Sequence, residues 1–276
     1  MKCKASDHIA EFLAEKGIRH VFGIIGSGNA HIFDSITSRG FTEIVCVHHE
    51  QAAVMAMMTY TRTSGNISAV LLTTGAGSTN GVTGVVSAWM DSVPGIIISG
   101  NENSRFTLPE NPLRIWGIQG YDSVEMVRKV TKYAHRVMDP TLIRFELEKA
   151  HSIATTGRPG PVWLDIPMNI QAAPVEKGGL PEYHAAPLSP SVPADSRVLQ
   201  NPTKAAEAVL EKMKSAKRPV IWLGHGIRWA QATHLVHPLL DQFKTAALVS
   251  WAGIDLIDSD HPQVFGRAGI YGQRSA

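Results

Sequence analysis

The sequence predicts an α/β fold, with a doubly wound parallel sheet followed by an incomplete, Rossmann-like second unit. Three observations support this prediction. Short apolar runs rich in β-branched residues alternate with stretches of helical periodicity along most of the chain. The apolar runs are continuous, as in strands that are covered on both faces. Glycine-rich loops directly follow several of these runs, where a strand is expected to turn into a helix.

The expected elements follow one another closely in the first part of the chain. Ser6 or Asp7 can cap a first helix, which Gly17 ends. We expect strands at residues 18–25, 44–47, 68–74, 95–99, 127–134 and 161–166. The helices expected between them carry Ile32 and Ile36, start at Gln51, cover 82–90 and start at Pro140. Residues 101–117 are polar and contain Pro109 and Pro112, so we expect a long loop there.

The composition changes sharply after this first part. Prolines and a Gly-Gly pair interrupt any periodicity in residues 173–198, which are therefore expected to be a linker. It separates a first domain over 1–172 from the N-terminal part of a second domain over 199–276. In the second domain we expect helices near 203–213 and 234–243 and strands at 219–223 and 246–250. Two strands joined by one crossover do not close a core, so this domain is expected to be incomplete.

Charge and cysteine content argue against several classes of protein. The 276 residues include 26 basic and 24 acidic side chains, a net charge of +2, so we expect neither nucleic acid nor a membrane surface as a partner. The N-terminus lacks the apolar core of a signal peptide, and no apolar run reaches membrane-spanning length. Cys3 and Cys46 are too few for a disulfide framework. We expect a soluble cytoplasmic protein.

Two stretches suggest a site. Glu50 follows the apolar run at 44–47 and precedes a nearly uncharged helical stretch, at the end of a strand where open α/β sheets place their sites. A helix dipole alone also favours an acid at this position, which leaves both interpretations open. The second stretch is the glycine-rich loop 75–81, directly after the run at 68–74. Its glycines can approach a ligand, although tight strand-to-helix turns also need glycine.

Together the two stretches resemble thiamine-diphosphate-dependent enzymes of the acetolactate synthase type. The matching motifs keep the order and spacing of that family within the first part of the chain. They are Val21-Phe22-Gly23, His49-Glu50-Gln51-Ala52-Ala53, Thr74-Gly75-Ala76-Gly77-Ser78-Thr79-Asn80, Ala88-Trp89-Met90-Asp91-Ser92-Val93-Pro94, Gln119 and Gly157-Arg158-Pro159-Gly160-Pro161-Val162-Trp163-Leu164-Asp165-Ile166-Pro167.

The resemblance implies a role for each matching residue. Glu50 matches the glutamate that hydrogen-bonds the aminopyrimidine ring of thiamine diphosphate, while the cofactor itself carries the carbanion chemistry. His49 and Gln119 are further catalytic candidates, with a packing histidine and a surface amide as the alternatives. The loop positions that match the contacts to the pyrimidine are Ile25, Gly26, Thr74 and Gly75.

A flavin is a secondary expectation of the same resemblance. Some family members carry FAD in a non-redox role, and Arg158, Gly224, Gly226 and residues 266–272 match where it would bind. A surface arginine before Pro159 and a plain strand-to-helix turn explain the same residues equally well.

Several positions depart from acetolactate synthases proper. Ile25 replaces a proline, Ile118 an aromatic residue, Gly120 an acidic residue and Met168 a lysine. The loop Gly23-Ile24-Ile25-Gly26-Ser27 is similar to that of sulfoacetaldehyde acetyltransferases. Acyl transfer to an acceptor other than pyruvate therefore stays an alternative to carboligation or decarboxylation.

The family's motif for the diphosphate and its metal, Gly-Asp-Gly followed by an asparagine, does not occur in these 276 residues. No metal ligand is therefore expected on this chain. We expect a second polypeptide to supply the diphosphate and Mg²⁺ half, paired with this chain in a dimer-like hetero-oligomer that acts on pyruvate or a related α-keto acid. The alternatives are a truncated form of a longer protein and a non-catalytic partner that stabilises or regulates a full-length paralogue.

Overall fold

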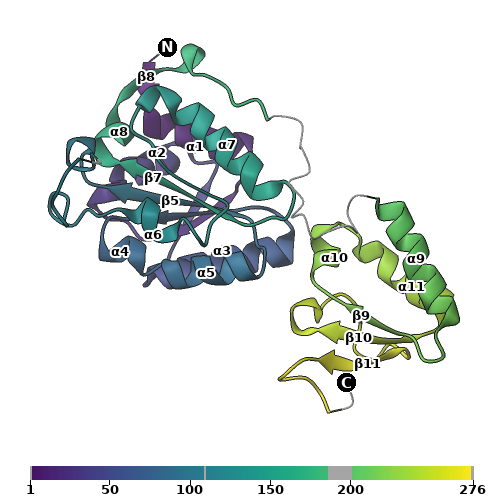
Figure 1. Cartoon of the computed structure of the whole chain (residues 1–276). Helices are drawn as coiled ribbons and strands as arrows, with labels where there is room; N and C mark the ends of the chain where they lie inside the picture. The colour runs from purple at the N-terminus through teal and green to yellow at the C-terminus, as the bar shows by residue number, and fades with distance from the viewer. Residues whose placement is uncertain (1, 109, 186–200, 275–276) are drawn as a thin grey trace. The chain divides into compact units, whose positions relative to one another are not determined.

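Six short strands in the first half of the chain lie side by side in one parallel sheet of the computed structural model, which describes residues 2–108, 110–185 and 201–274 (Figure 1). In spatial order they are β3 (Glu43–Cys46), β2 (His20–Gly23), β4 (Ala69–Leu72), β5 (Gly95–Asn101), β7 (Pro161–Pro167) and β6 (Tyr133–Arg136). Every residue of β4, β5 and β7 is buried, as their continuous apolar runs predict. The predicted α/β fold class is confirmed.

Helices cover both faces of this sheet. Figure 1 shows α1 (Ala5–Glu15), α2 (Ala30–Arg39) and α7 (Ile143–Thr155) on one face, and α3 (Glu50–Ser64) and α5 (Val82–Met90) on the other. The main core lies under the first three helices, where Phe12, Ile36 and Leu147 pack on the sheet. The shorter helices are η1 (Ser27–Asn29), α4 (Ala76–Thr79), η2 (Ser104–Phe106), α6 (Ser123–Val127), η3 (Pro140–Leu142), α8 (Met168–Ala172) and η4 (Lys177–Gly179).

The order of the strands reverses beside β2. The chain passes from β2 outward to β3 and then crosses back to β4 on the other side of β2. The loops that follow β2 and β4 lead to helices on opposite faces of the sheet, α2 and α5, but their first residues meet at the carboxyl ends of the two strands, a position called the crevice below. In open α/β sheets such a switch point, at the carboxyl ends of the strands, is the usual position of a ligand site.

The expected linker over 173–198 differs from the structure in its first part. β8 (Pro174–Glu176) pairs antiparallel with β1 (Lys2–Lys4), and Val175 and Leu180 are buried in the main core. An edge strand tolerates Pro174, and the apolar Val175 and Leu180 tie the segment down despite its prolines. The first compact unit accordingly extends over Met1–Ala186 rather than 1–172, and residues 186–200 of the predicted linker lie outside the described residues.

The strand expected at 127–134 is also placed differently. The Asp122 side chain accepts a hydrogen bond from the Glu125 N–H at 3.2 Å and caps the short helix α6, which continues to Val127. The edge strand β6 begins only at Tyr133. The prediction missed this helix because its single turn is too short to produce a periodic pattern.

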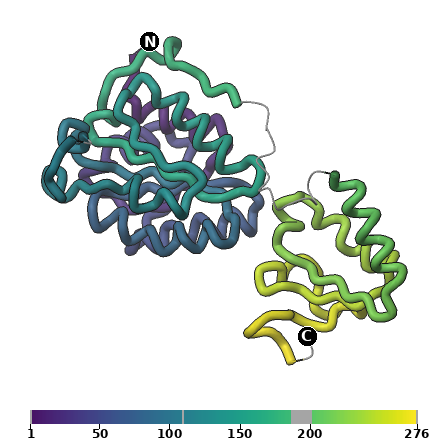
Figure 2. Tube along the Cα trace, viewed as in Figure 1, coloured from purple at the N-terminus to yellow at the C-terminus, as the bar shows by residue number. Residues whose placement is uncertain are grey.

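The second unit, Pro187–Ala276, contains a smaller parallel sheet; Figure 2 follows the chain through each unit. Its strands are β11 (Val264–Ala268), β10 (Ala246–Ser250) and β9 (Val220–Leu223), in that spatial order. Its helices are α9 (Pro202–Ser215), α10 (Gly226–Trp229), η6 (Thr233–Leu235), α11 (Val236–Phe243) and η7 (Trp251–Gly253). The sequence had indicated two of the three strands, because Gly266 and Arg267 interrupt the apolar run of β11.

Only one face of this smaller sheet is well covered by the described residues. Leu223, Val249 and Leu240 belong to its core cluster, whereas Trp222 is 63% exposed and Phe265 is 55% exposed on the other face. Throughout the part of the chain that the structure describes, no helix has both the length and the apolar character needed to cross a membrane.

Gly100 on β5 tests how tightly the main sheet packs against the loop after β2. A Cβ atom at this position would lie 1.9 Å from the backbone oxygen of Gly28, which cannot rotate away. Gly100→Ala should lower the free energy of unfolding by about 3 kcal/mol, the upper part of the range for overpacking. Urea unfolding measures this loss. Gly178→Ala is the control, because nothing lies within 4 Å of a Cβ there, and an equal loss in both variants would contradict the close approach.

His8 on α1 predicts a dependence of stability on pH. Its side chain is buried, and neither ring nitrogen has a hydrogen-bond partner among the described residues. Burial lowers the pKa of His8 below its ordinary 6.5, so the unfolded chain binds the proton more readily than the folded chain. The stability that His8 provides is therefore present above about pH 6.5 and is lost as the pH falls through the folded pKa.

The test compares urea unfolding at neutral and mildly acidic pH. His8→Leu should reduce the loss of stability on acidification, without abolishing it, because burial also lowers the pKa of His151. The exposed His184 provides a control variant, His184→Leu, which should keep the full pH dependence. A pH dependence that is the same in all three proteins would exclude His8 as a titrating group.

Candidate functional site

The loops after β2 and β4 approach each other more closely than side chains would allow. The Gly28 N–H donates to Thr73 Oγ1 at 3.3 Å. A Cβ at Gly26 would lie 2.3 Å from the same oxygen, and a Cβ at Gly28 would lie 2.0 Å from Thr74 Oγ1. Glycine is therefore required at both positions, and the two loops form one continuous backbone surface at the switch point.

Glu50 is the first residue of α3 and lies at this same edge of the sheet. Its side chain is largely buried, and Asn80 Nδ2 donates to Glu50 Oε2 at 2.9 Å. The other oxygen, Oε1, has no donor among residues 2–108, 110–185 and 201–274, and a Cβ at Gly77 would lie 3.0 Å from it. One oxygen of the carboxylate is thus held in place, while the other is available to a hydrogen-bond donor on a ligand.

The glycine-rich loop after β4 combines a strained glycine with an unpaired buried hydroxyl. Gly75 has φ 66° and ψ −132°, a combination that is strained for other residues. Its carbonyl accepts a hydrogen bond from Ser78 Oγ at 2.9 Å. The Thr74 hydroxyl is buried and without a hydrogen-bond partner in the described part of the chain. An unpaired buried hydroxyl costs free energy unless a ligand or water satisfies it.

The turn that carries Gln119 lies directly against Gly75. A Cβ at Gly75 would be 2.7 Å from the Gln119 backbone oxygen. Trp116 and Gly120 exchange two backbone hydrogen bonds, of 2.8 and 2.7 Å, which close the turn. The buried Glu102 accepts the Gln119 N–H at 3.3 Å from below. The Gln119 side chain itself is exposed at the tip of the turn.

Tyr121 joins this turn to the glycine loop through a 2.8 Å hydrogen bond between its hydroxyl and Ser78 Oγ. Burial raises the pKa of Tyr121 to about 12, so the hydroxyl stays neutral near pH 7. Sequence reasoning did not find Tyr121 or Glu102, since both lie in a segment without periodicity. The role of Asn80 was also missed, although it belongs to a motif that had been noted.

The structure brings some predicted residues together and separates others. Glu50, Gly26, Thr74, Gly75 and Gln119 lie around the same crevice at the carboxyl ends of the strands. Each is positioned by a strand end or by the glycine contacts described above.

Ile25 and His49 occupy the outside of this crevice. Ile25 is 60% exposed in the loop that leaves β2. The exposed His49 caps α3, with its Nδ1 accepting the Gln51 N–H at 3.2 Å. This contact agrees with the structural alternative for His49.

Arg158 lies just before β7, at the amino ends of the strands, whereas Glu50 lies at their carboxyl ends. Its Nε donates to Ser92 Oγ at 2.7 Å, near the start of β5. It borders a cavity of about 310 Å³ together with Trp89, Met90, Lys132 and Pro159. Arg158 is therefore separated from the crevice by the length of the strands.

The crevice fits the aminopyrimidine ring of thiamine diphosphate. Glu50 Oε1 has no donor in the described part of the chain and can form a hydrogen bond with the ring, and the glycines bring the neighbouring backbone close to it. Within the described ranges, no group of three or more His, Cys, Asp or Glu side chains is placed to hold a metal ion.

Comparison with known proteins agrees with this geometry. The description "Thiamine pyrophosphate enzyme, N-terminal TPP binding domain" matches residues 3–130, and "Thiamine pyrophosphate enzyme, central domain" matches residues 206–276. The chain belongs to the thiamine pyrophosphate enzymes, pyrophosphate being another word for the diphosphate.

Within that family the similar curated proteins are large subunits of acetolactate synthase. The chain is 32% identical to that of Haemophilus influenzae over 280 residues, covering 100% of this chain and 46% of the relative. It is 29% identical to that of Buchnera aphidicola subsp. Schizaphis graminum, over 98% of this chain and 46% of the relative. It is 29% identical to the large subunit of isozyme 3 of Escherichia coli K12, over 98% of this chain and 45% of the relative. The chain thus spans about half the length of the curated relatives it matches.

Gly75→Ala tests the contact between the glycine loop and the Gln119 turn. The variant should lose more stability than Gly65→Ala, which costs about 1–2 kcal/mol for its positive φ alone. Gly65 controls for the positive φ, with φ 75° and nothing within 4 Å of a Cβ, but its ψ of −2° differs from the −132° of Gly75, so the exchange at Gln119 is the reading specific to the contact. Urea unfolding gives both values, and amide hydrogen exchange at Gln119 should rise in Gly75→Ala alone. Equal effects of the two substitutions would mean that the turn does not rest on Gly75.

Proposed function

We propose that this chain is the pyrimidine-binding subunit of a thiamine diphosphate-dependent carboligase or decarboxylase that acts on pyruvate or a related α-keto acid. The observation that carries the proposal is the burial and the incomplete hydrogen bonding of the Glu50 carboxylate. Its carboxylate is largely buried at the switch point, with Oε2 held by Asn80 and Oε1 next to Gly77 without a donor among the described residues. The names of the similar acetolactate synthase subunits support this class of chemistry.

Each residue of the crevice has a separate role in binding. When bound, thiamine diphosphate supplies a nucleophilic carbon that adds to the ketone of a keto acid. Glu50 Oε1 would hold the aminopyrimidine ring by a hydrogen bond and would be the group of this chain that exchanges a proton with it. Asn80 keeps the carboxylate in one rotamer, and Gly77 lets the glycine loop pass directly beside Glu50 Oε1. Gln119, at the exposed tip of its turn, orients the keto acid.

The diphosphate and Mg²⁺ half of the site is assigned to a second polypeptide, which pairs with this chain in a dimer-like hetero-oligomer. The motif Gly-Asp-Gly does not occur in these 276 residues, and a longer form of this protein that carries it is the alternative to a second polypeptide. Co-purification with the product of a neighbouring gene tests it. A chain that turns over a keto acid alone, with thiamine diphosphate and Mg²⁺ added, would contradict the two-polypeptide assignment.

Two alternatives remain part of the proposal. Acyl transfer of the sulfoacetaldehyde acetyltransferase type is the second candidate reaction, because Ile25 stands where acetolactate synthases have proline and the loop 23–27 is similar to that of those transferases. A non-catalytic partner of a full-length paralogue would have no physical use for the open Glu50 oxygen.

Flavin is the secondary cofactor, and the absorbance of the purified complex tests for it. A cytoplasmic location is supported by the free thiols of Cys3 and Cys46, which reducing compartments maintain.

Glu50→Gln separates catalysis from scaffolding. The amide keeps the size of the side chain and removes its ability to take up a proton, so keto acid turnover by the assembled complex should fall about 100-fold or more. Size-exclusion chromatography should give the same assembly as for the unchanged protein. Glu43→Gln, an exposed acid at the other end of β3, is the control and should keep full activity. Unchanged turnover in Glu50→Gln would support the scaffold instead.

A further inference from the structure

The segment that carries Gln119 and Tyr121 to the crevice has little regular structure of its own. It runs from Thr107, behind β5, to Asp122 at the start of α6. A long irregular segment loses much conformational entropy when it is ordered, so specific contacts must hold it. Glu102 and Gly75 hold its tip, as described above. Its base is held by a different residue.

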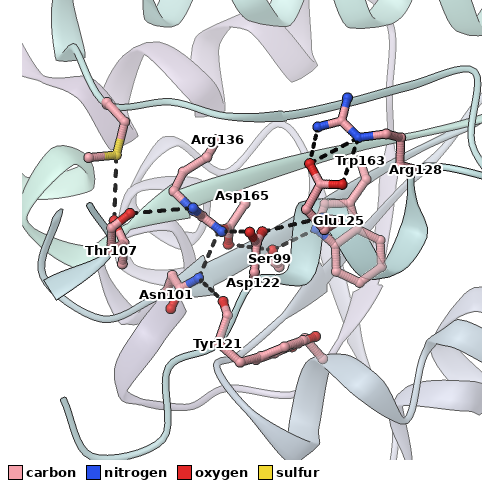
Figure 3. A network of polar contacts seen from close by, with 12 residues as sticks. Ser99, Asn101, Thr107, Tyr121, Asp122, Glu125, Arg128, Arg136, Trp163 and Asp165 are labelled. Carbon is pink, nitrogen blue, oxygen red and sulfur yellow. Dashed lines mark hydrogen bonds and ion pairs between the residues drawn. The ribbon is translucent and has the colours of Figure 1, made fainter. Parts of the chain in front are cut away.

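Arg136, at the end of the edge strand β6, contacts this segment at its beginning, middle and end; Figure 3 shows the first and last contacts, with Thr107 and Asp122. Its Nη1 donates to the Thr107 carbonyl at 3.5 Å, a long contact, and its Nη2 donates to Asp122 Oδ1 at 2.8 Å. The guanidinium lies 4.5 Å from the centre of the Trp116 ring, over its face. The remaining donor, Nε, is directed to Asp165 Oδ2 at 2.7 Å.

Asp165 fixes this arginine to the sheet. It lies on β7 and is fully buried, and its carboxylate also accepts hydrogen bonds of 2.8 Å from Ser99 Oγ and Asn101 Nδ2 on β5. Trp163 Nε1 in turn donates to Ser99 Oγ at 2.9 Å. Figure 3 shows these side chains converging on Asp165 from neighbouring strands. A buried ion pair of this kind contributes little net stability and is better suited to selecting one conformation.

The same network reaches the residues of the crevice. Asn101 Nδ2 also donates to the Tyr121 carbonyl at 3.1 Å, and the Tyr121 hydroxyl meets Ser78 in the glycine loop. Trp116, under the guanidinium, closes the turn that bears Gln119. A lysine in place of Arg136 would keep the charge but could not fill this arrangement, because a planar fork and a stacking face are both needed.

We propose that Arg136 is the positioning residue for the keto acid side of the site: it holds Trp116 and Asp122 so that Gln119 stays against Gly75. This inference rests on the proposed function for the role of Gln119. The anchoring of the turn by Arg136 stands on the contacts alone, which allows the two to be tested separately.

The first test measures the anchoring on the chain itself, by amide hydrogen exchange. Arg136→Lys should speed exchange at the Trp116 and Gly120 amides about tenfold, as expected for the loss of one charged hydrogen bond. Amides in β4 should not change. Arg128→Lys is the control, since the exposed Arg128 pairs only with Glu125 among the described residues. Unchanged exchange at Trp116 and Gly120 would overturn the proposal.

A second variant guards against misfolding. Removing Arg136 leaves the carboxylate of Asp165 buried and unpaired, so Arg136→Met is combined with Asp165→Asn, which removes that charge. The double variant should again speed exchange at Trp116 and Gly120. If Arg136→Lys unfolds the whole unit, exchange in the double variant decides the question.

The second test uses the assembled complex. Arg136→Lys should raise the KM for the keto acid about tenfold, with a smaller change in kcat and an unchanged affinity for thiamine diphosphate. In a Gln119→Ala background the same substitution should have little further effect on KM, because the two residues act through one contact. A loosened turn with an unchanged KM, or additive effects, would overturn the positioning role. If the unchanged complex turns over no keto acid, the proposed function fails, and the inference on Arg136 is then decided by the exchange rates alone.

Discussion

The close approach of the loops after β2 and β4 is the constraint on which the rest of the site depends. Gly28 lies against Thr74 on one side and against Gly100 of β5 on the other, with no space for a Cβ at either contact. This packing brings the carboxyl ends of strands from both directions of the chain to one crevice, where α3 begins with Glu50. A substitution in these glycines would separate the two loops before it changed any reactive group.

Two buried carboxylates of the first unit, Asp165 on β7 and Glu50 on α3, differ in how many hydrogen-bond donors the protein gives them. Asp165 accepts hydrogen bonds from Ser99, Asn101 and Arg136, so its oxygens are occupied by the protein. Glu50 receives one donor, from Asn80, and its second oxygen is left open. A saturated carboxylate stabilises one conformation, whereas a partly satisfied one can exchange a hydrogen bond with a ligand. The number of donors thus distinguishes a structural acid from a chemical one, even though both are buried.

Sequence reasoning found the parts of the site that are encoded locally. Glu50 and Gly75 each follow an apolar run directly, so their place at the edge of the sheet could be predicted from the pattern of the chain. Arg136, Glu102 and Tyr121 could not, because their partners lie far away in the sequence and nothing in the local pattern indicates them. The strand β8 was missed for the same reason, because its partner β1 lies at the other end of the unit. The expectation that Arg158 binds a flavin came from its motif alone. Only the direction of the strands shows that Arg158 lies at their amino ends, away from Glu50.

The distribution of tryptophans has a practical consequence for spectroscopy. Trp163 is fully buried and Trp116 is 8% exposed in the first unit, whereas Trp222 and Trp251 are 63% and 66% exposed in the second. Indole emission moves to longer wavelength when the ring enters water, and the two exposed rings of the second unit are already in contact with it. The second unit also holds the partly buried Trp229, so a red shift of the intrinsic fluorescence reports mainly on the first unit once Trp229 is replaced by Phe. Its melting can be followed optically in the intact chain, without separating the two halves or adding a dye.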